Sequence, residues 1–314
     1  MDSRRGTKAL ELWGSMAILP SLEGACQTDG LPIPAKLSAY IIVKNEAAAI
    51  GGCLESLKGL ADELIVVDDE STDSSASLCR DFGARVFLRK LDGFGPQKQF
   101  ALNQCTGDWA LSIDADERVT PELANEIKAI VLGAPSVDGY LISFNMYFLG
   151  HRLRHGGVGQ QLKLRFFRRK KGRYLSREIH EQVVVDGETR KLKGAMDHFS
   201  YPTLEKYLEK LPMYTNMAAR QRWERRKRFS SWHHLRPAWE LFVRIVIKGA
   251  WRDGQAGLLY AALSAHAAWL RSVKLWEMDN GKAAQSPDSA NRSNGRRPFG
   301  NTDVDGAARG HSKR

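Results

Sequence analysis

From Leu37 to Leu149, short apolar runs alternate with segments whose apolar residues recur at helical spacing. Five runs have the length and apolar character of buried strands: LSAYIIV (37–43), ELIVV (63–67), ARVFL (84–88), DWALSI (108–113) and GYLISFNMYFL (139–149). Between the first two, Ile50, Cys53 and Leu57 share one helical face. This alternation predicts an α/β fold with a mostly parallel sheet flanked by helices.

Helix starts and stops support this reading. Ser71 or Asp73 is expected to cap a helix over 72–82 that ends at Gly83. Thr120 is followed by a proline and a glutamate, which together are typical of a helix start, and that helix should run to about residue 132.

Two acidic clusters follow predicted strands. Asp68 and Asp69 come after the strand at 63–67, and Asp114, Asp116 and Glu117 come after the strand at 108–113. The carboxyl ends of parallel strands meet at one edge of a sheet, where ligands bind, so both clusters should open onto that edge. Like charges this close are costly at the edge of a core unless a cation joins them.

A hard cation is one candidate partner for these carboxylates. The oxygens of Asp114 and Asp116 suit Mg²⁺ or Mn²⁺, and such a metal can stabilise a diphosphate leaving group. Asp-x-Asp is by itself a weak motif, and an ordinary surface turn is the alternative. Asp68 and Asp69 could accept hydrogen bonds from a uracil or a ribose, or could cap the next helix. Lys98 could lie beside phosphates, or could be a solvated loop lysine.

Taken in order, four stretches resemble the inverting family 2 glycosyltransferases, which have the GT-A fold: IIVKNEAAAIGGCLESL, DELIVVDDESTDSS, GFGPQKQFALNQCTGDWALSIDADERVTPEL and IHEQV. The resemblance covers about residues 37–278 and is closest to the lipopolysaccharide core branch, often described as β-1,4-glucosyltransferases. It implies transfer of a hexose, glucose being the best guess, from a UDP-sugar to a lipid-linked or lipopolysaccharide-core acceptor. It also implies a divalent metal, Mg²⁺ or Mn²⁺.

The resemblance implies roles for individual residues. Asp116 would be the main metal ligand, supported by Asp114, and Asp69 would contact the base of the donor. The residues expected to bind the nucleotide sugar are Asn45, Glu46, Asp68, Asp69, Lys98 and Asp114.

Inversion in one displacement needs a base for the acceptor hydroxyl. The family has a His-Glu pair that matches His180 and Glu181, so Glu181 is the expected base; Glu178 and Asp186 are other carboxylates in this region. The alternative is that the pair only braces a loop. Gln161 stands where many relatives have an aspartate, and this difference could weaken the activity or alter its specificity.

The chain is expected to have four parts: a loosely ordered extension (1–36), the catalytic GT-A domain (37–200), a helical region (201–280) and a disordered tail (281–314). The basic stretch KLRFFRRKKGR in the second part reads as a hairpin or loop. Its residues Arg165, Arg168 and Arg169 are expected to bind the acceptor.

The chain carries 47 Lys and Arg against 36 Asp and Glu, a formal net charge of +11, which suits an anionic partner. The run from Arg220 to Arg228 interleaves with aromatic residues, as suits an anionic bilayer surface. The apolar helices at 238–251 and 257–273 are short for a membrane span and could instead pack on the core or lie in the interface. Four scattered cysteines suit reduced thiols. We therefore expect a cytoplasmic protein attached peripherally to the inner face of the plasma membrane.

Two other functions use the same features. A metal-dependent nucleotidyltransferase would also need Asp-x-Asp, but would release pyrophosphate where a glycosyltransferase releases a nucleoside diphosphate. A basic nucleic-acid-binding protein would bind in a salt-dependent way without needing Asp116, but it leaves the acidic strand ends unexplained, so no nucleic-acid partner is expected.

Overall fold

The structure is a computed structural model that describes residues 35–133, 135–158, 161–175 and 182–284. The chain divides into two units, Met1–Pro34 and Ala35–Arg314, and the described residues belong to the second. The predicted extension (but for residues 35 and 36) and tail (but for residues 281–284) therefore lie outside the described residues, as do His180, Glu181 and Glu178.

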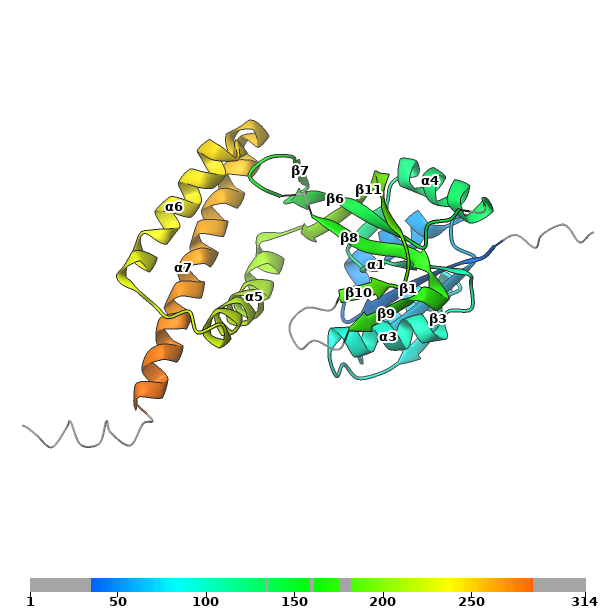
Figure 1. Ribbon diagram of the computed structural model, residues 1–314, viewed down its shortest axis with the longest axis horizontal. Helices are drawn as coiled ribbons and strands as arrows, with labels where there is room; N and C mark the ends of the chain where they lie inside the picture. Colours follow the sequence, from blue (N-terminus) through cyan, green and yellow to red (C-terminus); the bar gives the residue numbers. More distant parts are fainter. Residues whose placement is uncertain (1–34, 134, 159–160, 176–181, 285–314) are drawn as a thin grey trace, which may run out of the picture. The chain divides into compact units, whose positions relative to one another are not determined.

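The first half of this unit alternates strands and helices (Figure 1). In chain order they are β1 (Leu37–Val43), α1 (Ala47–Leu57), β2 (Glu63–Asp68), α2 (Ser75–Asp81), β3 (Arg85–Leu88), α3 (Phe94–Gln104), β4 (Trp109–Ser112), β5 (Glu117–Val119) and α4 (Pro121–Leu132). The strands β3, β2, β1 and β4 are adjacent in this order and all run parallel. This half confirms the α/β prediction and four of its five strands closely, whereas β5 was not predicted. The fifth predicted strand, at 139–149, belongs to the second half.

The second half extends the same sheet. Its strands are β6 (Gly139–Phe148), β7 (His151–Leu153), β8 (Leu162–Arg168) and β11 (Thr189–Tyr201), while β9 (Gly172–Leu175) and β10 (Gln182–Val185) form a separate pair after the 3-10 turn η1 (Arg169–Lys171). The nine strands described in the main sheet have the order β3-β2-β1-β4-β8-β6-β11-β5, with β7 on β6. Because β8 is antiparallel to both β4 and β6, the strands β6 and β11 again run with β1. The sheet is thus mostly parallel, which is consistent with the GT-A fold.

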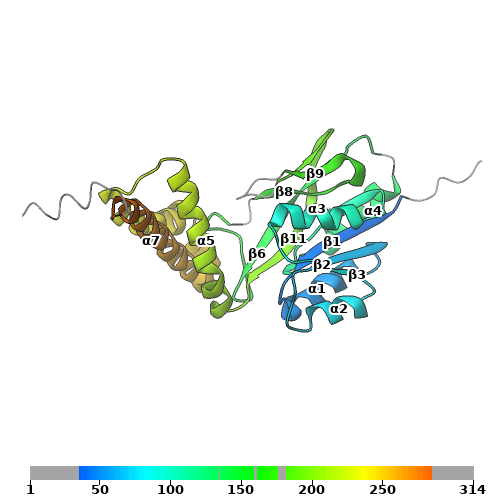
Figure 2. The same ribbon diagram turned by 90° about the horizontal axis from the view of Figure 1, so that it is seen from below.

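Helices cover both faces of the sheet (Figure 2). On one face, α1 and α4 bury Ile50, Leu54, Leu123 and Ile127 against the strands. On the other face, α3 packs through Ala101 and Leu102. Burying one large apolar side chain of this kind contributes roughly 1.5–3 kcal/mol to the stability of the fold.

The helical region follows β11. It consists of α5 (Leu204–Glu224), η2 (Ser231–His234), α6 (Arg236–Phe242), the π-helical segment η3 (Val243–Ile247), η4 (Ala250–Asp253) and α7 (Gly254–Ala284). A third core joins it to the sheet, where Phe148 and Leu153 pack with Tyr207 and Leu211 of α5.

Two local expectations were wrong. The stretch predicted as a basic hairpin or loop contains β8, which lies inside the sheet between β4 and β6 because Phe166 and Phe167 are fully buried. The helix predicted at 72–82 begins at Ser75, and Ser74 is its N-cap residue. Asp73 instead accepts hydrogen bonds from the backbone N–H of Ala47 and of Ser75.

Candidate active site

The two acidic clusters lie at one edge of the sheet, as the sequence predicts. Asp68 ends β2 and the cluster at Asp114 follows β4, and these strands flank β1 in parallel. Asp69 continues the ladder, since its N–H donates to the carbonyl of Val43 at the end of β1.

The positive partners of Asp114 come from the protein itself. Lys98 Nζ of α3 lies 3.0 Å from its Oδ1, and Arg165 of β8 lies 2.6 Å from its Oδ2. Arg165 also pairs with Glu117 at 3.0 Å, and Glu117 is fully buried. Burial alone would raise the pKa of Asp114, but Arg165 and Lys98 hold it well below its usual range. Burial raises the pKa of Glu117, and the neighbouring Asp114 adds to that rise.

A chain of hydrogen-bonded hydroxyl groups holds Arg165 in place. Its guanidinium donates to Ser112 Oγ at 3.2 Å, and Ser112 Oγ also accepts from Tyr174 Oη at 3.2 Å. Tyr174 in turn lies 2.7 Å from the hydroxyl of the buried Tyr40. The cations around Asp114 are therefore held in place before any ligand arrives.

Asp116 has a different set of neighbours. His198 Nε2 of β11 and Lys210 Nζ of α5 each lie 3.4 Å from one of its two carboxylate oxygens. Burial alone would raise the pKa of Asp116, but the hydrogen bond from His198 and the charges of His198 and Lys210 lower it. Glu46 is nearby: burial raises its pKa, Lys210 opposes that rise, and Asp116 adds to it.

Asp68 and Asp69, at the end of β2, are held by hydrogen bonds and an ion pair from neighbouring loops. Asp68 accepts hydrogen bonds from the N–H of Ser71 at 3.1 Å and from its hydroxyl. Asp69 pairs with Lys44 at 2.8 Å and accepts from the N–H of Leu91 at 2.8 Å. Burial would raise the pKa of Asp69, but these two hydrogen bonds lower it overall.

Asn45 joins the loops that carry these groups. Its backbone is left-handed (φ 53°), which asparagine tolerates better than most residues. Its Oδ1 accepts from the N–H of Thr72 at 2.8 Å, and its own N–H donates to Ser71 Oγ. Asn45 therefore holds the loop after β1 against the loop after β2.

The three arginines that are expected to bind the acceptor do not lie together. Arg165 is buried and committed to Asp114 and Glu117, so it is a counter-ion of the acidic cluster. Arg168 pairs in register with Trp109 at the start of β4, and Arg169 Nε donates to the carbonyl of Gly107 at 2.6 Å. Because β8 runs antiparallel to β4, Arg168 and Arg169 lie at the edge opposite the acidic clusters.

Lys98 is not the solvated loop lysine that the sequence left open as an alternative. Its exposed fraction is only 5%, and it belongs to α3.

Gln161 is exposed and directly precedes β8. The beginning of β8 lies at the edge where β4 ends, so Gln161 belongs to the edge that carries the acidic clusters.

The chain matches the family described as Glycosyl transferase family 2 over residues 38–184. It is 33% identical over 264 residues to the lipopolysaccharide core biosynthesis glycosyltransferase LpsC of Rhizobium meliloti, an alignment that covers 81% of this chain and 97% of LpsC. The chain belongs to glycosyltransferase family 2. This family 2 glycosyltransferase is also 30% identical to an uncharacterized glycosyltransferase of Rickettsia typhi over 77% of this chain and 87% of that protein.

This family 2 glycosyltransferase is also similar, more distantly, to a solved structure. That structure is glucosyl-3-phosphoglycerate synthase from Mycobacterium tuberculosis, with 17% identity, a TM-score of 0.40, and coverage of 60% of this chain and 79% of that chain.

Two residues that contact Asp116 in this family 2 glycosyltransferase, His198 and Lys210, were not predicted from the sequence. His198 lies in a strand that carries no motif, and Lys210 is one lysine among several on an amphipathic helix. They lie 82 and 94 positions from Asp116, and only the folding of β11 and α5 brings them to it.

The donor groups near Asp116 fit a divalent metal in part. Asp116 supplies a carboxylate, which suits Mn²⁺ or Mg²⁺ when water or phosphate oxygens complete the shell. The imidazole of His198 fits Mg²⁺ poorly and would suit Mn²⁺ better. Both oxygens of Asp114 already accept from cations, so Asp114 fits the role of direct ligand less well. Among the described residues, no three His, Cys, Asp or Glu side chains form a ready metal cluster.

Proposed function

We propose that this family 2 glycosyltransferase transfers a hexose, most simply glucose, from a UDP-sugar to a lipid-linked or lipopolysaccharide-core acceptor, with inversion and with the help of Mg²⁺ or Mn²⁺. The observation that carries the proposal is the set of ion pairs that Asp114 and Asp116 form at the edge of the sheet. Asp114 is neutralised by two fixed cations, while Asp116 stands beside an imidazole and a lysine from other elements. A site of this kind can hold a negatively charged diphosphate beside carboxylates.

Each chain residue has a distinct role in this proposal. Asp116 and His198 would hold the metal, which supplies positive charge to the departing diphosphate. Lys98 and Lys210 add fixed positive charge at the same edge, and Arg165 holds Asp114 in place. Asp69, with Lys44, would position the nucleoside, while Asp68 and Asn45 shape the loop around it.

The proposed base is Glu181, with His180 beside it in sequence. Glu181 takes the proton of the acceptor hydroxyl as its oxygen bonds to the anomeric carbon, and the bond from that carbon to the diphosphate breaks. Attack from the face opposite the diphosphate inverts the anomeric configuration.

The product that is released tests this proposal. We expect UDP to appear when the protein is mixed with UDP-glucose, Mn²⁺ and a core oligosaccharide acceptor. We also expect UDP-sugars, with Mn²⁺, to raise the melting temperature more than other nucleotide sugars. Release of pyrophosphate from a nucleoside triphosphate instead would show nucleotidyl transfer and contradict the proposal. No observation favours that alternative over the family's own reaction.

We also propose that the protein works at an anionic membrane surface. None of the described helices combines the length and hydropathy needed to cross a bilayer. The segment η2–α6–η3 instead carries an exposed apolar stripe at alternating spacings of three and four, with side chains between 48% and 78% exposed: Trp232, Leu235, Trp239, Phe242 and Val246. Such spacing places these side chains on one helical face.

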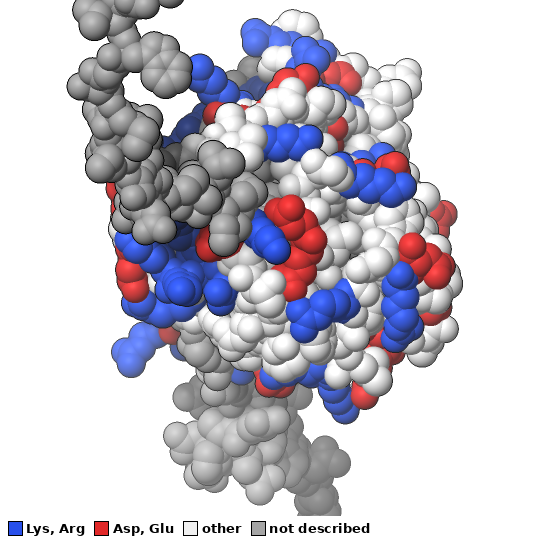
Figure 3. Space-filling model, turned by 90° about the vertical axis from the view of Figure 1, so that its right-hand side faces the viewer, with Lys and Arg blue, Asp and Glu red and all other residues white. Residues whose placement is uncertain are grey.

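Basic residues flank the stripe at both ends. Arg225 to Arg228 form a run of four before it, and Lys248 and Arg252 follow it. Tryptophan and basic side chains together suit the interface of an anionic bilayer, where each basic residue contributes about 1 kcal/mol. On the face of the molecule in Figure 3, by contrast, acidic and basic side chains are interspersed.

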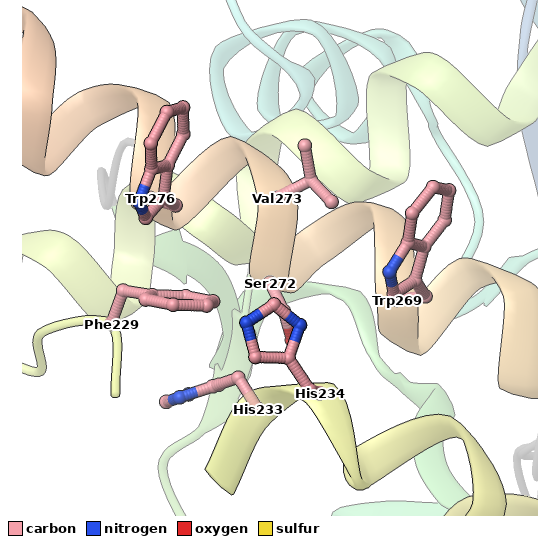
Figure 4. Close-up of a pocket in the computed structure, with 7 residues that line it drawn as sticks. All are labelled: Phe229, His233, His234, Trp269, Ser272, Val273 and Trp276. Carbon is pink, nitrogen blue, oxygen red and sulfur yellow. The ribbon is translucent and has the colours of Figure 1, made fainter. Parts of the chain in front are cut away.

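An aromatic cavity adds to this part of the surface. It measures about 440 Å³, and Figure 4 shows Trp269, Val273 and Trp276 of α7 lining it opposite Phe229, His233 and His234.

Co-sedimentation with vesicles tests the membrane proposal. We expect binding to vesicles that contain 30% phosphatidylglycerol, and at least a tenfold weaker binding for the double variant Trp239→Ser/Phe242→Ser. The matched control is Leu88→Ser/Leu132→Ser, which removes two apolar residues of the catalytic domain that are even more exposed than Trp239 and Phe242. Equal binding by both double variants would contradict the proposal, as would a stripe that forms a dimer in solution without binding vesicles.

A further inference from the structure

A second cavity, of about 170 Å³, lies between α5 and α7, with β11 and η3 contributing to its wall. Its lining is unusual for a helix interface, because it contains four tyrosines and two arginines: Tyr201, Tyr207, Tyr214, Tyr260, Arg244 and Arg271. The hydroxyl groups of Thr215 and Ser264 also line it. Such a wall offers hydrogen-bond donors and positive charge, and no acidic side chain is among the residues that line it.

Arg271 is the centre of this arrangement. Its Nε is fully buried and has no hydrogen-bond partner among the described residues. Burial lowers the pKa of Arg271, and the positive charges of Arg236 and Arg244 lower it further. A buried N–H donor on a charged group is costly when it is left without a hydrogen bond, and an anion in the cavity would supply one.

The surroundings are rich in positive charge and poor in negative charge. The pKa of Arg222 is also lowered, first by burial and then by Arg236 and Arg271. Glu240 is the carboxylate of this group, and it already pairs with Arg244 at 2.8 Å. In the described part of the chain, the guanidinium groups of Arg222, Arg236, Arg244 and Arg271 thus have Glu240 as their carboxylate neighbour, an imbalance that an anionic ligand would correct.

The cavity adjoins the candidate active site through two elements. Lys210 of α5 contacts Asp116, and the next residue along, Leu211, lines the cavity together with Tyr214. On β11, His198 contacts Asp116, and Tyr201 lines the cavity three residues later. The cavity and the candidate active site are thus built on the same two elements, α5 and β11.

We propose that this cavity binds a phosphate group carried by the acceptor, with Arg271 as its main ligand and Arg244 and the hydroxyl of Tyr201 as further donors. The proposal rests on the proposed function, since it assigns a subsite to the same acceptor. Phosphate fits better than a neutral sugar hydroxyl because a guanidinium fork donates two parallel hydrogen bonds to it. The cavity would thus select phosphorylated acceptors.

Inorganic phosphate alone gives the first test, independent of catalysis. At constant ionic strength, we expect 10 mM phosphate to raise the melting temperature of the wild type and of Arg220→Gln, but not of Arg271→Gln. Arg220 is the matched control because it is exposed on α5 and, within the described residues, forms its ion pair with Glu224 of its own helix. Without phosphate, Arg271→Gln should melt no lower than the wild type, since it removes a half-buried charge whose Nε has no hydrogen-bond partner among the described residues.

Opposite results overturn the proposal. A phosphate shift in Arg271→Gln equal to that of the wild type would remove Arg271 as a ligand. A lower melting temperature without phosphate would assign Arg271 a structural role. Should Arg271→Gln fail to fold, that failure also assigns a structural role, and Arg271→Lys then decides the ligand question, since the loss of the fork should weaken phosphate binding at least fivefold.

Kinetics separate the possible sources of the phosphate. With a phosphorylated core oligosaccharide, Arg271→Gln should raise the acceptor KM at least tenfold and leave the KM of the UDP-sugar unchanged; with the dephosphorylated oligosaccharide the two enzymes should be alike. Competition by phosphatidylglycerol vesicles but not by the sugar phosphate would assign the cavity to a lipid headgroup and contradict the proposal. If no transfer occurs at all, the phosphate experiment still decides this inference while the proposed function fails.

Discussion

At the scale of single residues, three carboxylates within four positions are tolerated because each has at least one cationic neighbour. Arg165 lies between Asp114 and Glu117, while His198 and Lys210 serve Asp116. Asp114 thus has its charge compensated inside the protein. Asp116 lies farther from its partners, at 3.4 Å, and is the carboxylate that we propose as the metal ligand.

Replacement of Asp116 tests this division. Asp116→Asn removes the charge without changing the volume, so we expect turnover to fall roughly 100-fold or more while the melting temperature stays within a few degrees. Calorimetric titration with Mn²⁺ should show at least a tenfold loss of affinity. Asp81→Asn, at an exposed position on α2, should change neither quantity. Unchanged Mn²⁺ affinity in Asp116→Asn would rule out Asp116 as a ligand.

The proposed base can be tested at the same scale. Glu181→Gln keeps the size of the side chain but cannot accept the proton, so kcat should fall about 10²–10⁴-fold. The affinity for the UDP-sugar, measured by titration without acceptor, should remain within a factor of two or so, because the base acts on the acceptor. Normal turnover in this variant would exclude Glu181 from the mechanism.

At the scale of elements, one buried aspartate ties the loop after β7 to the helical region. Asp253, at the end of η4, accepts from the N–H groups of Arg154 and His155 at 3.0 and 2.7 Å, and it pairs with His155 Nδ1 at 2.8 Å. Burial would raise the pKa of Asp253, but the hydrogen bonds from His155 and Arg154 lower it overall.

A stability measurement tests this connection. Asp253→Asn should lower the free energy of unfolding in urea at pH 7 by roughly 1–3 kcal/mol, as expected for hydrogen bonds to a charged group. Since the folded pKa is depressed, the wild type has this stability above the unfolded pKa, near 4, and loses it as the pH falls through the folded pKa. The difference between the two proteins should therefore shrink below about pH 4. A difference that stays constant with pH would show that the charge of Asp253 is not the cause.

At the scale of the whole molecule, the thiols report on the integrity of the core. Cys53, Cys79 and Cys105 are free and buried, in agreement with the predicted reduced thiols, and Cys26 lies outside the described residues. Burial raises the pKa of Cys79 to about 11 and that of Cys105 to about 12. Neither thiol forms the reactive thiolate at neutral pH.

The burial of these three cysteines predicts how they react with a thiol reagent. In the variant Cys26→Ser, a thiol reagent at pH 8 should modify the folded protein hardly at all, and all three remaining cysteines once urea unfolds it. The labelling curve should coincide with the loss of circular dichroism. Rapid modification of the folded protein would contradict a core that excludes solvent from these side chains.

Much of the first half of the fold could be read from the sequence, since strands of five or six apolar residues and helices with one apolar face are local patterns. The cap at Thr120 and the strand at 37–43 were predicted almost to the residue. The placement of both acidic clusters at one edge followed too, because parallel strands end on the same side.

What the sequence alone determined is thus the class of fold, the family and the acidic edge, because each depends on short-range periodicity or on an ordered set of local motifs. Only the tertiary structure decided which charges meet. The sequence presents Arg165 as part of a basic run, but β8 inserts it into the sheet beside Asp114; His198 and Lys210 reach Asp116 from far along the chain. The reason is physical: a carboxylate is paired by whichever cation the packing of distant elements brings within a few ångströms, and no local pattern records that choice.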